Sequence, residues 1–291
     1  MFEGVLPALI TPFTKDDTID KAGFKENVRY VEEGGVSGIV GCGTTGESAT
    51  LSTAEHKELI DLMVDCANVP VIAGTGSNNT AEALELTKYA DDAGVDAVLL
   101  ISPYYNKPNN AGLIAHFTKI ADSVDVPIVL YNVPSRTAQN MPLEVIFELS
   151  KVDNIVGIKE ASGDLDKASQ IIENTVDEDF VIFSGDDGLT LPTLSIGGAG
   201  VISVVANIVP AKMMELFNAF QNGDMATARK VHYEVAPLIR ALFTETNPIP
   251  AKRACEAIGL ASGHLRLPLA PIGSENDKLL MDCLRELRCI E

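Results

Sequence analysis

Short, continuous apolar runs alternate with amphipathic stretches along most of this chain. The apolar runs, rich in Val, Ile and Leu, cover residues 5–10, 38–41, 69–73, 97–101, 127–131, 155–159, 180–184 and 200–204. They do not alternate apolar and polar residues, as expected for parallel strands that are covered on both faces. Eight such strands, each followed by a helix, predict an α/β protein with a (β/α)8 TIM barrel. A doubly wound open sheet fits the same alternation and is the alternative.

The stretches between the apolar runs have the spacing of amphipathic helices. The clearest cover residues 53–66, 80–93, 113–123 and 142–151, and Thr53, Thr80 and Pro142 lie where helices are expected to begin. Beyond residue 209 the strand pattern stops, and residues 211–222, 224–244, 250–259 and 275–289 have helical patterns. We therefore expect a catalytic barrel over residues 1–223 and a helical C-terminal extension over residues 224–291.

Lys159 ends the sixth apolar run, at a place where an apolar residue is expected. Burial of a lysine disfavours its charged form, and a neutral amine can attack a carbonyl to form a Schiff base. A lysine whose side chain only reaches the rim of the sheet is the other interpretation. Because catalytic groups of TIM barrels lie at the carboxyl ends of strands, the predicted barrel favours the nucleophile.

Composition and charge narrow the classes of partner. The 291 residues carry 22 basic and 41 acidic side chains, a net charge of −19, which disfavours nucleic acid and anionic membranes as partners. No apolar run approaches the roughly 20 residues of a membrane-spanning helix, and the N-terminal residues do not resemble a signal peptide. The five cysteines form no CxxC pair, and the four histidines are scattered. We expect a soluble cytoplasmic protein without a metal site.

The segment Gly41–Gly46 fits the GxGxxG pattern of dinucleotide-binding loops. It does not lead directly into a helix, and no acidic residue ends the next strand, so an NAD(P)-dependent oxidoreductase is a remote alternative. In a second interpretation the glycines expose backbone N–H groups, which bind a carboxylate together with the hydroxyls of Thr44 and Thr45. A simple glycine-rich turn is the third.

Hydroxyl and charged groups also follow other strands. Tyr104 and Tyr105 follow the fourth run, and Tyr131 ends the fifth. Each tyrosine alone fits ordinary packing, but linked hydroxyls at neighbouring strand ends can pass a proton. Arg136, in the next loop, is either solvated or suited to a carboxylate.

The acid pair after the seventh run has two interpretations. Asp186 and Asp187 follow Ser184 and Gly185. Two adjacent carboxylates fit a metal site, but the cap of the helix that follows, where anions are stabilised, is the favoured interpretation.

These motifs, taken together, resemble the dihydrodipicolinate synthase family over the whole length of the chain. They are GTTGESATL (43–51), AGTG (73–76), SPYYNKP (102–108), YNVPSRT (131–137), IVGIKEASGD (155–164), SGDD (184–187), GVISV (200–204) and NPIPAK (247–252). The resemblance implies a lyase without a cofactor, in which Lys159 forms an imine with pyruvate. The enamine then attacks L-aspartate 4-semialdehyde, which gives 4-hydroxy-tetrahydrodipicolinate in the diaminopimelate and lysine pathway.

The resemblance also implies roles for individual residues. Thr44, Tyr105 and Tyr131 match a proton relay in which the tyrosine at position 105 comes from a neighbouring subunit, so a homotetramer that is a dimer of dimers is expected. The other matches are to substrate-binding positions: Thr45 for the pyruvate carboxylate, Arg136 for the semialdehyde carboxylate, and Gly185 and Ile202 for backbone beside the nucleophile.

A site for inhibition by lysine is the last implication. The matching positions are Ser48, Ala49, His56, Asn78, Glu82 and Tyr104, whereas Thr53 departs from the ring residue that is common in the family. Aldolases for 2-keto-3-deoxy sugar acids or N-acetylneuraminate share the barrel and the lysine, and they are the alternative function. Arg136 and the doubled threonine favour the synthase.

Overall fold

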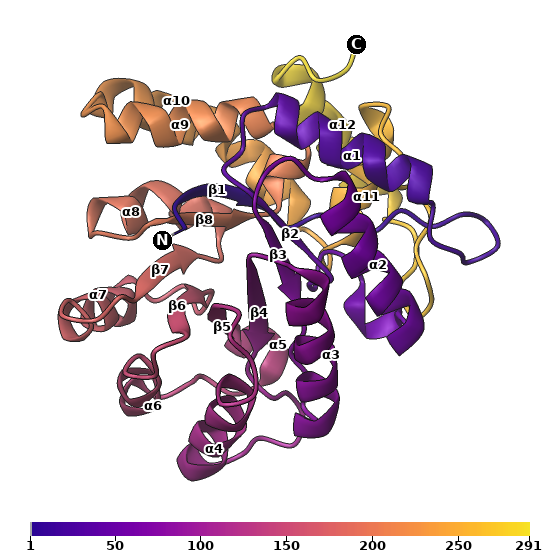
Figure 1. Ribbon diagram of the computed structural model, residues 1–291. Helices are drawn as coiled ribbons and strands as arrows, with labels where there is room; N and C mark the ends of the chain where they lie inside the picture. Colours follow the sequence, from indigo (N-terminus) through magenta and orange to yellow (C-terminus); the bar gives the residue numbers. More distant parts are fainter. Residues whose placement is uncertain (1) are drawn as a thin grey trace.

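Eight parallel strands form one sheet in the computed structural model, which describes residues 2–291. The strand order is β1-β8-β7-β6-β5-β4-β3-β2, and a parallel bridge between Ala8 and Val40 joins the two ends of the sheet. The strands therefore close into a barrel, with helices around the outside (Figure 1). The TIM barrel that the sequence predicts is confirmed, and the open sheet is not formed.

The strand bounds lie within a few residues of the expected ones. The strands are β1 (Gly4–Pro7), β2 (Ile39–Gly41), β3 (Val71–Gly74), β4 (Ala97–Ile101), β5 (Ile128–Asn132), β6 (Ile155–Glu160), β7 (Val181–Ser184) and β8 (Gly200–Ser203). Three short 3₁₀ turns are η1 (Ser48–Thr50), η2 (Asp187–Leu189) and η3 (Val205–Asn207).

The helices include several that the pattern did not single out. They are α1 (Lys21–Glu33), α2 (Thr53–Cys66), α3 (Thr80–Ala93), α4 (Asn110–Ala121), α5 (Pro134–Thr137), α6 (Leu143–Leu149), α7 (Leu165–Asn174), α8 (Thr190–Ser195), α9 (Pro210–Gln221), α10 (Met225–Leu242), α11 (Ile249–Ala257) and α12 (Ser274–Glu286). Helices α2 and α3 begin where expected, and the residues before them, Ser52 and Asn79, supply the capping side chains. None of the helices in residues 2–291 is long and apolar enough to cross a membrane.

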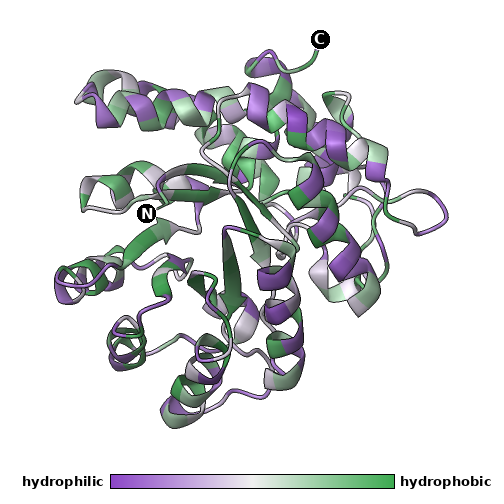
Figure 2. Cartoon of the chain, viewed as in Figure 1, coloured by the Kyte–Doolittle hydropathy of each residue, from purple (hydrophilic) through white to green (hydrophobic). Residues whose placement is uncertain are grey.

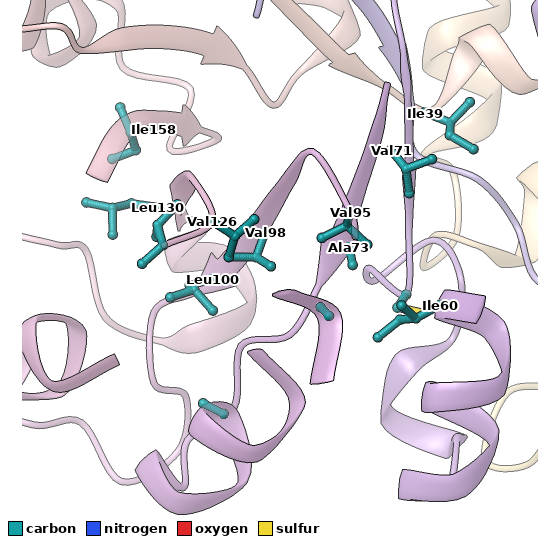
Figure 3. Packing of buried hydrophobic residues seen from close by; sticks show 14 of the residues in the cluster. Ile39, Ile60, Val71, Ala73, Val95, Val98, Leu100, Val126, Leu130 and Ile158 are labelled. Carbon is teal, nitrogen blue, oxygen red and sulfur yellow. The ribbon is translucent and has the colours of Figure 1, made fainter. Parts of the chain in front are cut away.

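Side chains alternate between the inside of the barrel and the layer beneath the helices. Val98, Leu130 and Ile158 belong to the cluster between the sheet and the helices (Figure 3). Their neighbours Leu99 and Tyr131 belong instead to the cluster inside the barrel. This alternation directs the residue after Ile158 towards the barrel interior.

The C-terminal helices pack against one side of the barrel. A separate apolar cluster joins Val5 of β1 and Val201 of β8 to Leu216, Leu238 and Leu284 of helices α9, α10 and α12. Figure 2 shows the strands in green and purple residues on the outer helix faces, as expected for elements that bury one side. The extension is therefore part of the packed molecule and brings residues beyond position 240 to the carboxyl ends of the strands.

Candidate active site

Lys159 lies near the carboxyl end of β6 and faces the barrel interior. The strand register places Tyr131 of β5 on one side of it and Phe183 of β7 on the other. Only 6% of the surface of Lys159 is exposed. The position at the catalytic end of a TIM barrel is the one that the strand pattern predicts.

The surroundings of Lys159 differ from those of the other buried lysines. Lys167 and Lys252 each have a carboxylate within 4 Å, whereas Lys159 forms no ion pair with any residue in the range 2–291. Its Nζ atom lies 4.4 Å from the centre of the Tyr131 ring. An aromatic face attracts a cation only weakly. With no carboxylate beside it among residues 2–291, the Lys159 amine has no counter-charge that would hold it in an ion pair.

A cavity of about 420 Å³ opens in front of Lys159. It brings together Lys159 with five of the other predicted site residues: Thr44, Thr45, Tyr131, Arg136 and Gly185. The volume suits a small molecule, and apolar residues such as Leu99 and Val204 complete the lining.

Gly185 has no room for a side chain. A Cβ atom there would lie 3.2 Å from Cε of Lys159 and 2.5 Å from the Cβ atom of Ala161. The backbone just after β7 can therefore pass close beside the lysine stem, as the family resemblance implies for this position.

The loop after β2 is a tight turn rather than the start of a helix. The N–H groups of Gly46 and Glu47 donate within the turn, to Gly43 and Thr44, at 3.1 Å. Cys42 and Glu47 have positive φ angles of 53° at its two ends. The dinucleotide interpretation is not favoured, because the loop leads into the short 3₁₀ turn η1 and the next α-helix begins only at Thr53.

Asn247 links two of the predicted binding residues and is not among the residues that the sequence singled out. Its side-chain amide donates to Thr45 Oγ1 at 3.0 Å, and its main-chain carbonyl accepts from Arg136 Nη2 at 2.9 Å. Asn247 begins the NPIPAK motif, which the sequence presented only as part of the family resemblance.

A buried ion pair holds the same loop from the other side. Lys252 Nζ lies 2.6 Å from Glu47 Oε1, and both side chains are 1% exposed or less. The other oxygen of Glu47 accepts from the Arg266 amide at 3.1 Å. The acid of GTTGE and the base of NPIPAK were both in the quoted motifs, yet nothing in the sequence showed that they meet.

Of the acid pair after β7, Asp186 caps the turn that follows, as expected, whereas Asp187 does not cap it and binds the turn after β8 instead. Asp186 accepts a hydrogen bond from the Gly188 N–H at 2.8 Å. Asp187 is buried and accepts from the N–H groups of Val204 and Val205, at 2.9 and 3.0 Å, at the turn that follows β8. Burial raises the pKa of the Asp187 carboxyl. Among residues 2–291, no three His, Cys, Asp or Glu side chains lie together as metal ligands would.

Two predicted site residues lie outside the cavity. Ile202 is buried inside the barrel, paired in register with Leu6 of β1. Tyr105 lies in the loop after β4 with 89% of its surface exposed and a φ angle of 70°. Reciprocal hydrogen bonds of Asn78 and Asn106 with main-chain carbonyls tie this loop to the one after β3.

A second cavity, of about 390 Å³, adjoins the first. The two share Thr44, Arg136 and Asn247 as lining residues. Five of the six positions matched to the lysine site line this second cavity: Ser48, Ala49, His56, Glu82 and Tyr104. The sixth, Asn78, donates a hydrogen bond to the carbonyl of Tyr104 at 3.1 Å.

The fold and the cavity define a barrel whose catalytic end holds a buried lysine, without an ion pair in residues 2–291, together with hydroxyl groups and the Arg136 guanidinium. This is the arrangement of a Schiff-base lyase. The family model described as the dihydrodipicolinate synthetase family matches residues 1–287. The 4-hydroxy-tetrahydrodipicolinate synthase of Methanococcoides burtonii is 72% identical over the full length of both chains.

Solved structures of dihydrodipicolinate synthases have the same fold as this chain. A chloride-inhibited dihydrodipicolinate synthase from Acinetobacter baumannii, complexed with pyruvate, has a TM-score of 0.96 and 39% identity and covers 100% of both chains. The enzyme from Cyanidioschyzon merolae with lysine bound has the same TM-score and identity over 99% of each chain.

The chain belongs to the dihydrodipicolinate synthetase family, as the motifs predicted. It is a lyase of lysine and diaminopimelate biosynthesis with 4-hydroxy-tetrahydrodipicolinate synthase activity.

Proposed function

We propose that Lys159 is the nucleophile of this activity. The observation that carries the proposal is a buried lysine at a strand end, beside a cavity and without a carboxylate partner among the residues that the structure describes. Its neutral amine attacks C2 of pyruvate, and water leaves as the imine forms. Loss of a proton from C3 then gives the enamine.

The enamine forms the new carbon–carbon bond with the aldehyde carbon of L-aspartate 4-semialdehyde. The aldehyde oxygen takes up a proton and becomes the 4-hydroxyl group. The amino group of the same substrate then attacks C2 and displaces Lys159, which closes the ring. Pyruvate and the semialdehyde thus give 4-hydroxy-tetrahydrodipicolinate and one water molecule.

The cavity supplies groups for both carboxylates. We assign Thr45 to the carboxylate of pyruvate, because it lies in the loop that lines the cavity with Thr44. We assign Arg136 to the carboxylate of the semialdehyde, since it is the arginine of the loop after β5 and faces both cavities. The backbone at Gly185 and at Ile202 flanks the imine in this assignment.

Turnover by the Arg136→Ala variant tests this assignment. The KM for the semialdehyde is expected to rise by about tenfold or more, because a charge-assisted hydrogen bond is lost, while the KM for pyruvate stays unchanged. Equal changes in both KM values would contradict it. Cleavage of 2-keto-3-deoxygluconate or N-acetylneuraminate at a comparable rate would favour the sugar-acid aldolase instead.

We further propose a proton relay of Thr44, Tyr131 and a Tyr105 that comes from a neighbouring subunit. Tyr105 is 89% exposed and outside the cavity of its own chain, although its loop is fixed by hydrogen bonds. An ordered, exposed tyrosine is typical of an interface. At least a dimer is required, and we propose a homotetramer built as a dimer of dimers, located in the cytoplasm.

Mixing of inactive subunits tests the shared site. Tyr105→Phe and Lys159→Ala homo-oligomers are each expected to have low activity. Hybrids between them contain sites with an intact lysine and an intact tyrosine, so activity should return after the subunits exchange. A mixture that stays as inactive as its components would contradict a tyrosine shared between subunits.

We propose that the second cavity binds lysine. Five of its lining residues match the family positions, and Glu82 offers a carboxylate for an ammonium group. Thr53 also lines this cavity and lacks the ring of many relatives, so weak inhibition is expected. Calorimetric titration with lysine, for wild type and Glu82→Gln, tests the site, and equal heats for the two proteins would contradict it.

A further inference from the structure

Asp186 is the one acidic residue among those of the range 2–291 that line the cavity in front of Lys159. The other charged residues of this lining, Lys159, Arg136 and Arg240, are all basic. A carboxylate at this place repels an anion such as pyruvate, so it does not help a cavity that receives pyruvate alone. Its presence indicates a ligand that also carries a positive group.

One oxygen of the Asp186 carboxylate is engaged, and the other is free. Oδ1 accepts a hydrogen bond from the N–H group of Gly188 at 2.8 Å, which caps the turn η2 and fixes the side chain. Oδ2 accepts no hydrogen bond from any residue in the range 2–291, and it is not sealed from solvent. A carboxylate has acceptor sites on both oxygens, so Oδ2 is left for a ligand.

The carboxylate borders the cavity itself. Gly188 also lines this cavity, and a Cβ atom built on Gly188 would lie 3.2 Å from Asp186 Oδ1. Apart from the chain neighbours of Gly188 and its own turn, no other atom within residues 2–291 would lie within 4 Å of that Cβ. The space in front of Gly188 is therefore open, and the Asp186 carboxylate lies at its edge.

Asp186 and Arg136 flank Lys159 on opposite sides. Arg136 follows β5 and Asp186 follows β7, and these two strands are the neighbours of β6, which carries Lys159. An α-amino acid bears a carboxylate and an ammonium group on one carbon atom. When such a molecule lies over Lys159, a guanidinium is available to its carboxylate and a carboxylate to its ammonium group.

We propose that Asp186 Oδ2 binds the α-ammonium group of the semialdehyde while Arg136 binds its α-carboxylate. Asp186 is then a specificity-determining residue that selects aldehydes with an α-amino group. The inference rests on the proposed function, because it places the semialdehyde at Arg136. The hydroxyl groups of the lining, such as those of Thr44 and Ser135, are neutral and offer no counter-charge to an ammonium group.

Comparison of two aldehydes tests the assignment. The probes are L-aspartate 4-semialdehyde and succinic semialdehyde, which lacks the amino group. In Asp186→Asn, the KM for the first is expected to rise by about tenfold or more, the size expected for loss of a charge-assisted hydrogen bond. The inhibition constant of succinic semialdehyde should stay within about twofold of the wild-type value or fall, and the KM for pyruvate should not rise.

Two further variants support this comparison. Asparagine can still accept from the Gly188 N–H group, so Asp186→Asn should keep the cap; Asp186→Ser also caps without a charge and replaces it if it does not fold. Asp153→Asn is the matched control, because Asp153 is exposed in the turn before β6, at the opposite end of the barrel. It removes the same charge and should change neither constant. Equal changes for both aldehydes in Asp186→Asn, or the same change in Asp153→Asn, would overturn the assignment.

Trapping with pyruvate and borohydride separates this inference from the proposed function. Pyruvate alone forms the imine, so wild type and Asp186→Asn should both gain the mass of a reduced adduct. If they do and the KM for L-aspartate 4-semialdehyde is unchanged in Asp186→Asn, only the role of Asp186 is wrong. If wild type gains no mass, the proposed function is wrong and the role of Asp186 with it.

Discussion

Lys159 and Lys252 are both buried lysines, but their surroundings are opposite. Lys159 lies beside a cavity and over the ring of Tyr131, with no carboxylate partner within residues 2–291. Lys252 lies 2.6 Å from Glu47 and 4.5 Å from the centre of the Phe13 ring. Burial lowers the pKa of the Lys252 ammonium group, while Glu47 opposes the change. Burial alone therefore does not define a nucleophile; access to a ligand and freedom from a fixed counter-charge do.

Removal of the Lys159 amine should have the largest effect on activity. Without an imine the lower-barrier route is lost, so turnover by Lys159→Met should fall by about 10⁴-fold or more. Because Lys159 forms no ion pair within residues 2–291, the free energy of unfolding of Lys159→Met in urea should equal or exceed that of wild type. A Lys159→Met variant that unfolds more easily than wild type and keeps its activity would contradict the proposed difference between Lys159 and Lys252.

Lys252→Met should show the opposite outcome. It leaves the Glu47 carboxylate buried without its counter-charge, which costs about 3–5 kcal/mol of unfolding free energy. The double variant Glu47→Gln/Lys252→Met should recover part of the loss. Lys57→Met is the matched control, because it breaks the exposed pair with Glu85, and it should cost less than about 1 kcal/mol. Equal losses from the buried and exposed pairs would contradict this account.

A methyl group added at Gly185 should affect both the stability of the fold and the rate at which Lys159 forms the imine. The new Cβ would crowd Ala161 and the lysine stem, so Gly185→Ala should lower the free energy of unfolding by about 1–3 kcal/mol and slow imine formation. At Gly43 a Cβ meets no atom within 4 Å, so Gly43→Ala should change stability by less than about 0.5 kcal/mol. Similar destabilisation at the two glycines would show that space beside Lys159 is not the cause.

The ion pair between Glu55 and Arg266 should give the stability of the protein a modest pH dependence. Hydrogen bonds from the Arg266 guanidinium lower the pKa of the Glu55 carboxyl to about 2. A lowered carboxyl pKa stabilises the fold above the unfolded value of about 4.3, and this contribution is lost as the pH falls towards 2. Glu55→Gln should therefore lower the melting temperature at pH 6 and converge with wild type at the acid end. A difference in melting temperature between wild type and Glu55→Gln that stays constant from pH 6 to the acid end would contradict the link between the Glu55 carboxylate and stability.

The barrel could be predicted from the sequence because its signal is local. Continuous apolar runs such as residues 97–101 mark strands that are covered on both faces, and Lys159 interrupts one of them at its end. The extension was also visible as helical patterns, and we propose that it begins at residue 224. It does not form a separate core, since Val5 of β1 and Leu238 of α10 share one cluster.

The remaining features depend on contacts between residues that are far apart in the chain. Asn247 meets Thr45 and Lys252 meets Glu47 across about 200 positions, and no local pattern encodes such a contact. The role of Asp187 was ambiguous for a similar reason, because the N–H groups that it binds belong to the turn after the next strand. Tyr105 matched the motif, but its exposure and its position outside the cavity lining are apparent only in the folded chain.

Peptide mapping after reduction with borohydride in the presence of pyruvate tests the central claim most directly. One stable adduct per chain is predicted, on the peptide that contains Lys159, and none on Lys252 or Lys167, which are at least as buried as Lys159 but paired. No adduct is predicted in Lys159→Met, and an undiminished one is predicted in the double variant Glu47→Gln/Lys252→Met. An adduct on Lys252 or Lys167, or one that persists without Lys159, would contradict the claim that the unpaired lysine is the nucleophile.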